Sequence, residues 1–238
     1  MLNSMKKEFY KFYRQKIPLY GIIALAVLMI YTCLTSNNSF LISSGFGSTQ
    51  WIIIILITIS SSFVSLEYQD NTIINLLYKN SNKWKIYLAK FVVLSVYCLV
   101  LIFFALIFTL SLIVIIGHHF SLLLIKELFF NVFGTFIYSG FIISMAFMLI
   151  SLLKNNTLVI VIGLLIGFLG APISNSIIST LNFFKWNPLN IIYITNQLSE
   201  LTFSHISKLS NVQIVLTALL YTLIFLIIGY KLFKRRRV

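Results

Sequence analysis

The chain has 238 residues, 59% of them hydrophobic and 10% charged, with a formal net charge of +13 at pH 7. Soluble domains average about 25% charged residues, and apolar stretches long enough to cross a bilayer recur along this whole sequence. The composition therefore excludes a soluble enzyme or binding module, and it predicts a single all-α transmembrane domain over residues 1–238.

Residues 1–17 predict a basic amphipathic helix that lies in the membrane interface. Apolar side chains recur there at helical spacing and form one stripe, which five Lys and Arg residues surround. The candidate interfacial residues are Phe9, Phe12, Tyr13 and Arg14. The helix has two interpretations: a plain membrane anchor, or a lever that joins a cytoplasmic partner to the first span.

Six predicted spans follow this helix. They cover about 19–34, 51–66, 91–116, 128–153, 158–178 and 212–233. The sequence Gly170-Ala171-Pro172 is expected to interrupt the fifth span. The segment 179–211, which is rich in aromatic residues, is interpreted either as short helices that dip back into the outer leaflet or as an ordinary extracellular loop.

The longest polar stretch lies between the second and third spans, at 67–90. Its middle is too apolar for a loop in water, so a membrane surface or a partner protein must cover it. We predict a short docking helix there, with a solvated loop as the alternative. The candidate docking residues are Glu67, Asp70, Asn71, Ile73, Ile74, Leu76, Leu77 and Tyr78.

Six spans place both termini on the same side of the membrane. Fifteen of the 18 Lys and Arg residues then lie on that side and three on the other. The positive-inside rule makes the first side cytoplasmic. Basic residues at the ends of spans also attract anionic lipid headgroups. Contact with membrane lipid therefore explains the positive net charge, and no nucleic-acid partner is needed.

The sequence lacks the groups that membrane enzymes and ion-coupled carriers need. All five acidic residues lie outside the predicted spans, and no Lys, Arg or His lies at mid-membrane. The pair His118-His119 has no acid placed to complete a metal site, and Cys33 and Cys98 make no disulfide framework. A phosphate-binding loop of the form G-x-x-x-x-G-K-S/T is missing. We therefore expect no catalytic residue, no metal site and no cofactor bound by this chain.

Small residues form a stripe in the fifth predicted span, at Gly163, Gly167 and Gly170. Such a stripe lets two helix backbones approach closely. It fits either a dimer interface or packing within the chain.

These features together resemble the ABC-2 type permease family, the membrane half of ATP-driven exporters. The most specific matches are Glu67-Tyr68-Gln69-Asp70-Asn71-Thr72 and Lys83-Trp84-Lys85-Ile86-Tyr87-Leu88-Ala89-Lys90. They look like the family's pattern of an acidic residue ending span 2, a short hydrophobic helix, and a basic start to span 3. The family usually has small residues or Pro before that basic pair, where this chain has Asn80-Ser81-Asn82.

The resemblance implies a transport subunit that dimerises with a second copy or a paralogue and couples to two separate ATPase subunits. ATP and Mg²⁺ would bind to the ATPase subunits. When those subunits close on ATP, the docking helix would transmit the movement to the membrane spans. The small size and Ile/Phe-rich spans are similar to bacteriocin or lantibiotic immunity permeases and to staphylococcal exporters of amphipathic toxin peptides. We therefore expect a hydrophobic or amphipathic peptide cargo and the cell membrane of a Gram-positive bacterium.

A different class of protein also fits the sequence. A non-transporting immunity or scaffold protein could bind a toxin peptide in the membrane without ATP. Such a protein would need no ATPase, and substitutions between Ile73 and Leu77 would leave its activity intact.

Overall fold

The computed structural model describes residues 2–35, 42, 44–69, 83–117, 121–199 and 207–234. Within these ranges the chain is helical and contains no strand, which confirms the all-α prediction. The helices are α1 (Leu2–Arg14), α2 (Ile17–Thr35), α4 (Ser48–Gln69), α6 (Lys83–Ile116), α7 (Leu122–Leu153), α8 (Asn156–Thr180), η1 (Asn182–Trp186), η2 (Pro188–Tyr193), α9 (Ile194–Ser199) and α11 (Asn211–Lys234).

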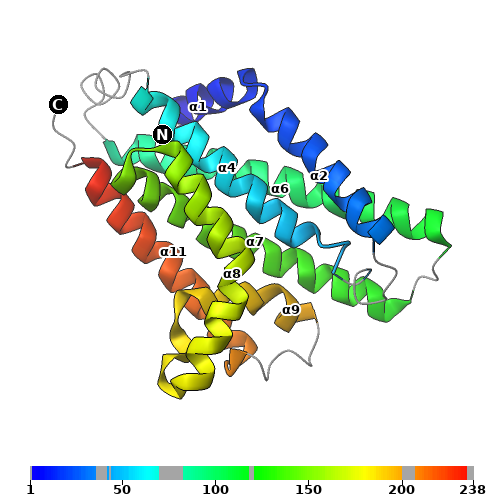
Figure 1. The fold of residues 1–238 in the computed structure, drawn as a ribbon. Coiled ribbons are helices and arrows are strands. Elements are labelled where there is room, and N and C mark those ends of the chain that lie inside the picture. The colour runs from blue at the N-terminus through cyan, green and yellow to red at the C-terminus, as the bar shows by residue number, and fades with distance from the viewer. Residues whose placement is uncertain are drawn as a thin grey trace.

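Six of these helices are long and apolar enough to cross a membrane, as predicted: α2, α4, α6, α7, α8 and α11. They form a bundle in which α7 is central and α2 lies at one edge (Figure 1). In α4 and α7, 61% of the residues in the most apolar window are buried, against 17–28% in the other four. The outer faces of these four helices are therefore the ones available to lipid or to another subunit.

The polar stretch at 67–90 belongs largely to the two helices that flank it. Helix α4 continues to Gln69 and α6 begins at Lys83, so only 70–82 separates them. Residues 70–82 lie outside the described part of the chain. The second and third spans are thus longer than their apolar content alone predicts, because polar residues extend both helices at the same end of the bundle.

The predicted interruption of the fifth span is wrong, because α8 runs through Pro172 without a break. Proline removes one helical hydrogen bond, the one that its own nitrogen would donate to the carbonyl of Phe168. A neighbouring element supports the helix at this point: the hydroxyl of Tyr193 in η2 donates to the carbonyl oxygen of Ala171 at 2.8 Å. Membrane helices tolerate proline where other protein groups supply such contacts.

Helix α1 is held against the bundle by a buried ion pair. The Lys90 side chain is 2% exposed, and its Nζ lies 3.0 Å from Oε2 of Glu8. The same Nζ lies 4.3 Å from the ring centroid of Phe63. Next to it, the ring of Phe12 makes edge-to-face contacts with Phe63 and Tyr97. One charge pair and one aromatic cluster therefore join α1 to α4 and α6.

Helices α4 and α8 approach each other closely at a glycine. A Cβ placed on Gly163 would overlap the Cγ2 atom of Ile57, which is 1% exposed. No such obstacle surrounds Gly140 of α7, where a Cβ would meet nothing within 4 Å. Gly163 thus packs within the chain, which is one of the two interpretations of the small-residue stripe.

We predict that Gly163→Ala lowers the free energy of unfolding by about 1–3 kcal/mol, because the added methyl group over-packs the contact with Ile57. An SDS titration in mixed micelles measures the change. Gly140→Ala is the matched control, and it should lose nothing, since alanine is the better helix former. Equal losses in the two variants would show that the Gly163 contact is not tight.

We also predict that Glu8→Gln lowers the free energy of unfolding by about 3 kcal/mol, because it removes a buried negative charge that lies 3.0 Å from Nζ of Lys90. The double variant Glu8→Gln/Lys90→Met should recover most of that loss, since no charge remains to be buried. The same titration measures both.

Lys11→Met is the control for this pair. Nζ of Lys11 lies 3.4 Å from Oε1 of Glu8, but the Lys11 side chain is 46% exposed, so its loss should cost less than about 1 kcal/mol. A double variant as unstable as Glu8→Gln alone would contradict the assignment of the loss to this charge pair.

Candidate functional site

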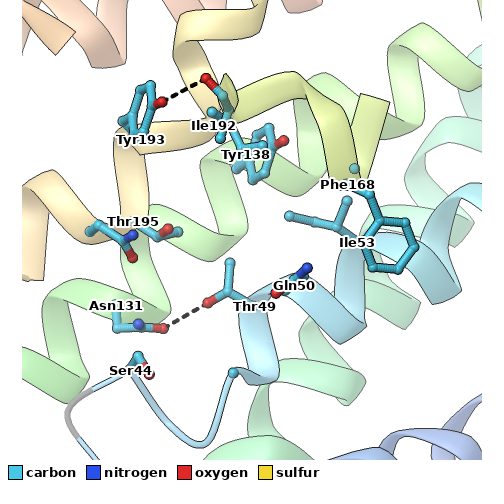
Figure 2. Close-up of a pocket in the computed structure, with 14 residues that line it drawn as sticks. Ser44, Thr49, Gln50, Ile53, Asn131, Tyr138, Phe168, Ile192, Tyr193 and Thr195 are labelled. Carbon is cyan, nitrogen blue, oxygen red and sulfur yellow. Dashed lines mark hydrogen bonds between the residues drawn. The ribbon is translucent and has the colours of Figure 1, made fainter. Parts of the chain in front are cut away.

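A cavity of about 290 Å³ lies between α4, α7, α8 and the segment formed by η2 and α9 (Figure 2). Its described lining consists of Ser44, Gly47, Thr49, Gln50, Ile53, Asn131, Tyr138, Gly167, Phe168, Ala171, Ile192, Tyr193, Thr195 and Asn196. None of these residues is charged, and polar amides and hydroxyls alternate with apolar side chains. We call this space the outer cavity.

The outer cavity and helix α1 lie at opposite ends of α4. Thr49 is in the first turn of α4, whereas Phe63, which contacts α1, is about 20 Å further along the helix axis. The positive-inside rule predicts that the α1 end is cytoplasmic. On that prediction the cavity lies in the extracellular half of the bundle.

Two threonines orient the amide of Asn131 in the cavity wall. The hydroxyl of Thr49 donates to Oδ1 of Asn131 at 3.0 Å, and the hydroxyl of Thr135 lies 3.3 Å from the same Oδ1. Thr135 also donates to the backbone carbonyl oxygen of Asn131 at 2.7 Å. The two hydroxyl oxygens are 2.8 Å apart. Figure 2 shows Thr49 and Asn131 pointing toward each other across the gap between α4 and α7. The other amide atom, Nδ2, is buried and has no hydrogen-bond partner in the described part of the chain.

Buried amides also hold together the segment after α8. Asn190 is fully buried, and its Nδ2 donates to the carbonyls of Lys185 and Ser207 at 2.7 and 2.9 Å. Gln197 is 1% exposed, and its Nε2 donates to the carbonyl of Leu209 at 2.8 Å. Burial raises the pKa of Tyr193, so its hydroxyl stays protonated and donates to α8. Hydrogen bonds therefore hold residues 182–199 in place, and part of this segment forms one wall of the outer cavity. Whether the segment dips into the outer leaflet stays a prediction.

The predicted docking residues are mostly beyond what the structure describes. Glu67 lies in the last turn of α4, at the end of the bundle that holds α1. The others lie outside the described residues: Asp70, Asn71, Ile73, Ile74, Leu76, Leu77 and Tyr78. The pair His118-His119 also lies outside them. The docking helix remains a prediction.

The predicted interfacial residues of α1 divide into two groups. Phe12 is 7% exposed and Phe9 is half-buried, and both pack against the bundle core. Tyr13 is 89% exposed, and Arg14 is also exposed. The apolar stripe of α1 therefore contacts protein through its phenylalanines, and only its other side remains for lipid.

The three glycines of the small-residue stripe face different surroundings. Gly163 packs on Ile57, and Gly170 is buried with Ile192 of η2 as its nearest neighbour. Gly167 is half-buried and lines the outer cavity. A dimer interface along this stripe stays a proposal, and two of its members already have partners within the chain.

Sequence reasoning missed the residues that define both ends of the bundle. Asn131, Thr135 and Ser139 recur every four residues in an otherwise apolar span, and this polar stripe was a signal for a buried or ligand-facing surface. Glu8 is the single acid before Glu67 in the chain, which marked it as unusual. Nothing in the sequence pairs Glu8 with Lys90, because the contact depends on how α1 folds back on α6.

Comparison with known families agrees with this architecture. Residues 4–170 match the family described as ABC-2 family transporter protein. A comparison with curated proteins finds no match. The matched region includes α1, the first four membrane helices and α8 as far as Gly170. Because it comprises 167 of the 238 residues and the structure holds six apolar helices, the chain belongs to the ABC-2 transporter family and is a multi-pass membrane protein.

Proposed function

We propose that this membrane transport subunit exports hydrophobic or amphipathic peptides, such as bacteriocins, antimicrobial peptides or toxin peptides, from a Gram-positive bacterium. It acts with two ABC ATPase subunits and with a second permease copy or a paralogue. ATP and Mg²⁺ bind to the ATPase subunits. The family match carries the transport role, because ABC-2 permeases are the membrane subunits of transporters that work with an ABC ATPase.

The chemistry of the outer cavity supports a peptide cargo. Its lining mixes uncharged amides and hydroxyls with apolar side chains, as in Asn131 and Ile53. Ionised substrates require a counter-charge when they leave water, and the described lining supplies none. Amphipathic peptides carry both apolar side chains and neutral amides, so they suit this lining better than an ion.

The position of 70–82 supports its role in docking the ATPase. This segment joins the end of α4 to the start of α6, and both helices contact α1 through the Phe12 cluster. Ile73, Ile74, Leu76 and Leu77 are the proposed anchors in a groove of the ATPase. Glu67 and Asp70 fix the start of the docking helix. Movement of this helix would act on α4 and α6 directly, and on α1 through the buried ion pair.

The exposed face of α8 supports contact with a second permease subunit. Leu165, Phe168 and Leu169 are about half-exposed and lie on one face of α8, whereas the Cβ position of Gly167 faces Ile54 of α4. Lipid covers such an apolar face in a monomer, and a second permease subunit would cover it in a dimer. This face, rather than Gly163 itself, is the proposed site of dimer contact.

We predict that Ile74→Asp reduces the amount of ATPase that co-purifies with the permease by at least about tenfold. A carboxylate at a desolvated anchor costs several kcal/mol, which exceeds the roughly 1.4 kcal/mol that corresponds to tenfold. The measurement is a pull-down of tagged protein in detergent, from cells that also express the neighbouring genes, followed by an assay of ATP hydrolysis.

Ile74→Val is the matched control, because it keeps an apolar anchor of similar shape and should retain the ATPase. Size-exclusion chromatography of all three proteins separates lost docking from misfolding. If the wild type brings down no ATPase, the transport proposal fails. Protection against a toxin peptide in the same cells would then identify the non-transporting immunity or scaffold protein.

A further inference from the structure

We propose that the outer cavity binds an uncharged, amide-containing segment of the peptide cargo, one or two residues long, and excludes charged side chains. The inference rests on the proposed function, since it names the part of the cargo that this cavity recognises. Three properties of the cavity carry it: an orphan hydrogen-bond donor, a neutral lining and a limited size.

The orphan donor is Nδ2 of Asn131. Asn131 is 5% exposed, and the hydroxyls of Thr49 and Thr135 lie 3.0 and 3.3 Å from its Oδ1, so Nδ2 is the amide atom without a partner in the described part of the chain. Other buried polar atoms there also lack a partner, but among their residues Asn131 is the one that lines the outer cavity, where a bound acceptor would complete its hydrogen bonding. A peptide carbonyl or a side-chain amide oxygen is such an acceptor.

The remaining polar groups of the lining are also neutral. Gln50 lines the cavity from α4, and Thr195 lines it from α9 (Figure 2). Asn196 of α9 also belongs to the lining. Amides and hydroxyls of this kind donate and accept hydrogen bonds, as a peptide group requires. A charged side chain in the same place would lose its hydration without gaining a counter-charge.

The size of the cavity limits what it holds. A volume of about 290 Å³ is at or below the lower end of the range for small-molecule pockets, roughly 300–1,000 Å³. It suits one or two residues and not a whole peptide. A second cavity that Asn131 lines, on the side of Ser48 and Thr109, has only about 20 Å³, which is room for one water molecule. The cargo segment therefore belongs in the larger space.

The test uses two labelled probes, N-acetyl-leucyl-glutamine amide and its charged isostere N-acetyl-leucyl-glutamate amide. Binding is measured at pH 7 on the full-length permease in nanodiscs, purified together with its ATPase. We expect the neutral probe to bind at least about tenfold more tightly, because the glutamate carboxylate cannot be solvated in this lining. We expect Asn131→Leu to weaken the neutral probe by about tenfold through loss of one hydrogen bond.

Two further variants keep the result interpretable. Asn156→Leu is the matched control: its Nδ2 donates to Oγ of Ser62, away from the cavity lining, so binding of the neutral probe should not change. If Asn131→Leu does not fold, Gln50→Leu decides, because Gln50 is exposed and its replacement disturbs no core. Gln50→Leu should weaken the neutral probe as well.

Equal affinity for the two probes, or absence of binding, would overturn the proposal. So would unchanged binding of the neutral probe by folded Asn131→Leu. ATPase co-purification in the same samples shows whether the cavity proposal alone fails or the transport proposal fails as well. If the ATPase is retained and the probes fail, the outer cavity is not a cargo site while the transport proposal stands. If the ATPase is missing from the wild type, the proposed function itself fails.

Discussion

The ion pair between Lys90 and Glu8 is the contact on which the α1 end of this bundle depends. An ammonium group that is 2% exposed in a membrane protein needs a negative partner, and α1 supplies one at 3.0 Å. The pair therefore makes α1 an integral part of the fold. Through Phe12 the same helix contacts α4, so three elements that are distant in sequence meet at one buried charge.

At the opposite end of the bundle, buried polar groups also need partners, and there the partners are neutral amides and hydroxyls. Thr49, Thr135 and Asn131 hydrogen-bond to one another between α4 and α7. Buried amides such as Asn190 and Gln197 satisfy the backbone carbonyls of an irregular segment in the same way. Several buried polar atoms of the described chain lack a hydrogen-bond partner, and among the residues that carry them Asn131 is the one that lines the outer cavity, where a ligand can supply the missing partner.

Local properties of the sequence were sufficient to predict the six membrane helices, and the orientation of the bundle in the membrane stays a prediction. Each span is a continuous apolar run, and the Lys and Arg residues concentrate at one set of span ends. The ends of α4 and α6 were harder to predict, because polar residues such as Lys83 extend a helix as well as Ile does. The break expected at Pro172 is wrong because α8 continues through the proline, and the contact that Tyr193 makes with Ala171 beside it follows from no local rule. The outer cavity could not be predicted, since four separate segments must come together to enclose it.

Pro172 has a mechanical consequence for α8. The missing hydrogen bond to the Phe168 carbonyl lowers the bending stiffness of the helix at one point, beside the cavity-lining turn that contains Ala171. Before this point Gly163 packs closely against α4, and after it Tyr193 and Lys208 donate to the carbonyl oxygens of Ala171 and Ile178. Helix α8 therefore bends most easily near Pro172, so a force that moves α4 would change the shape of the outer cavity at this wall.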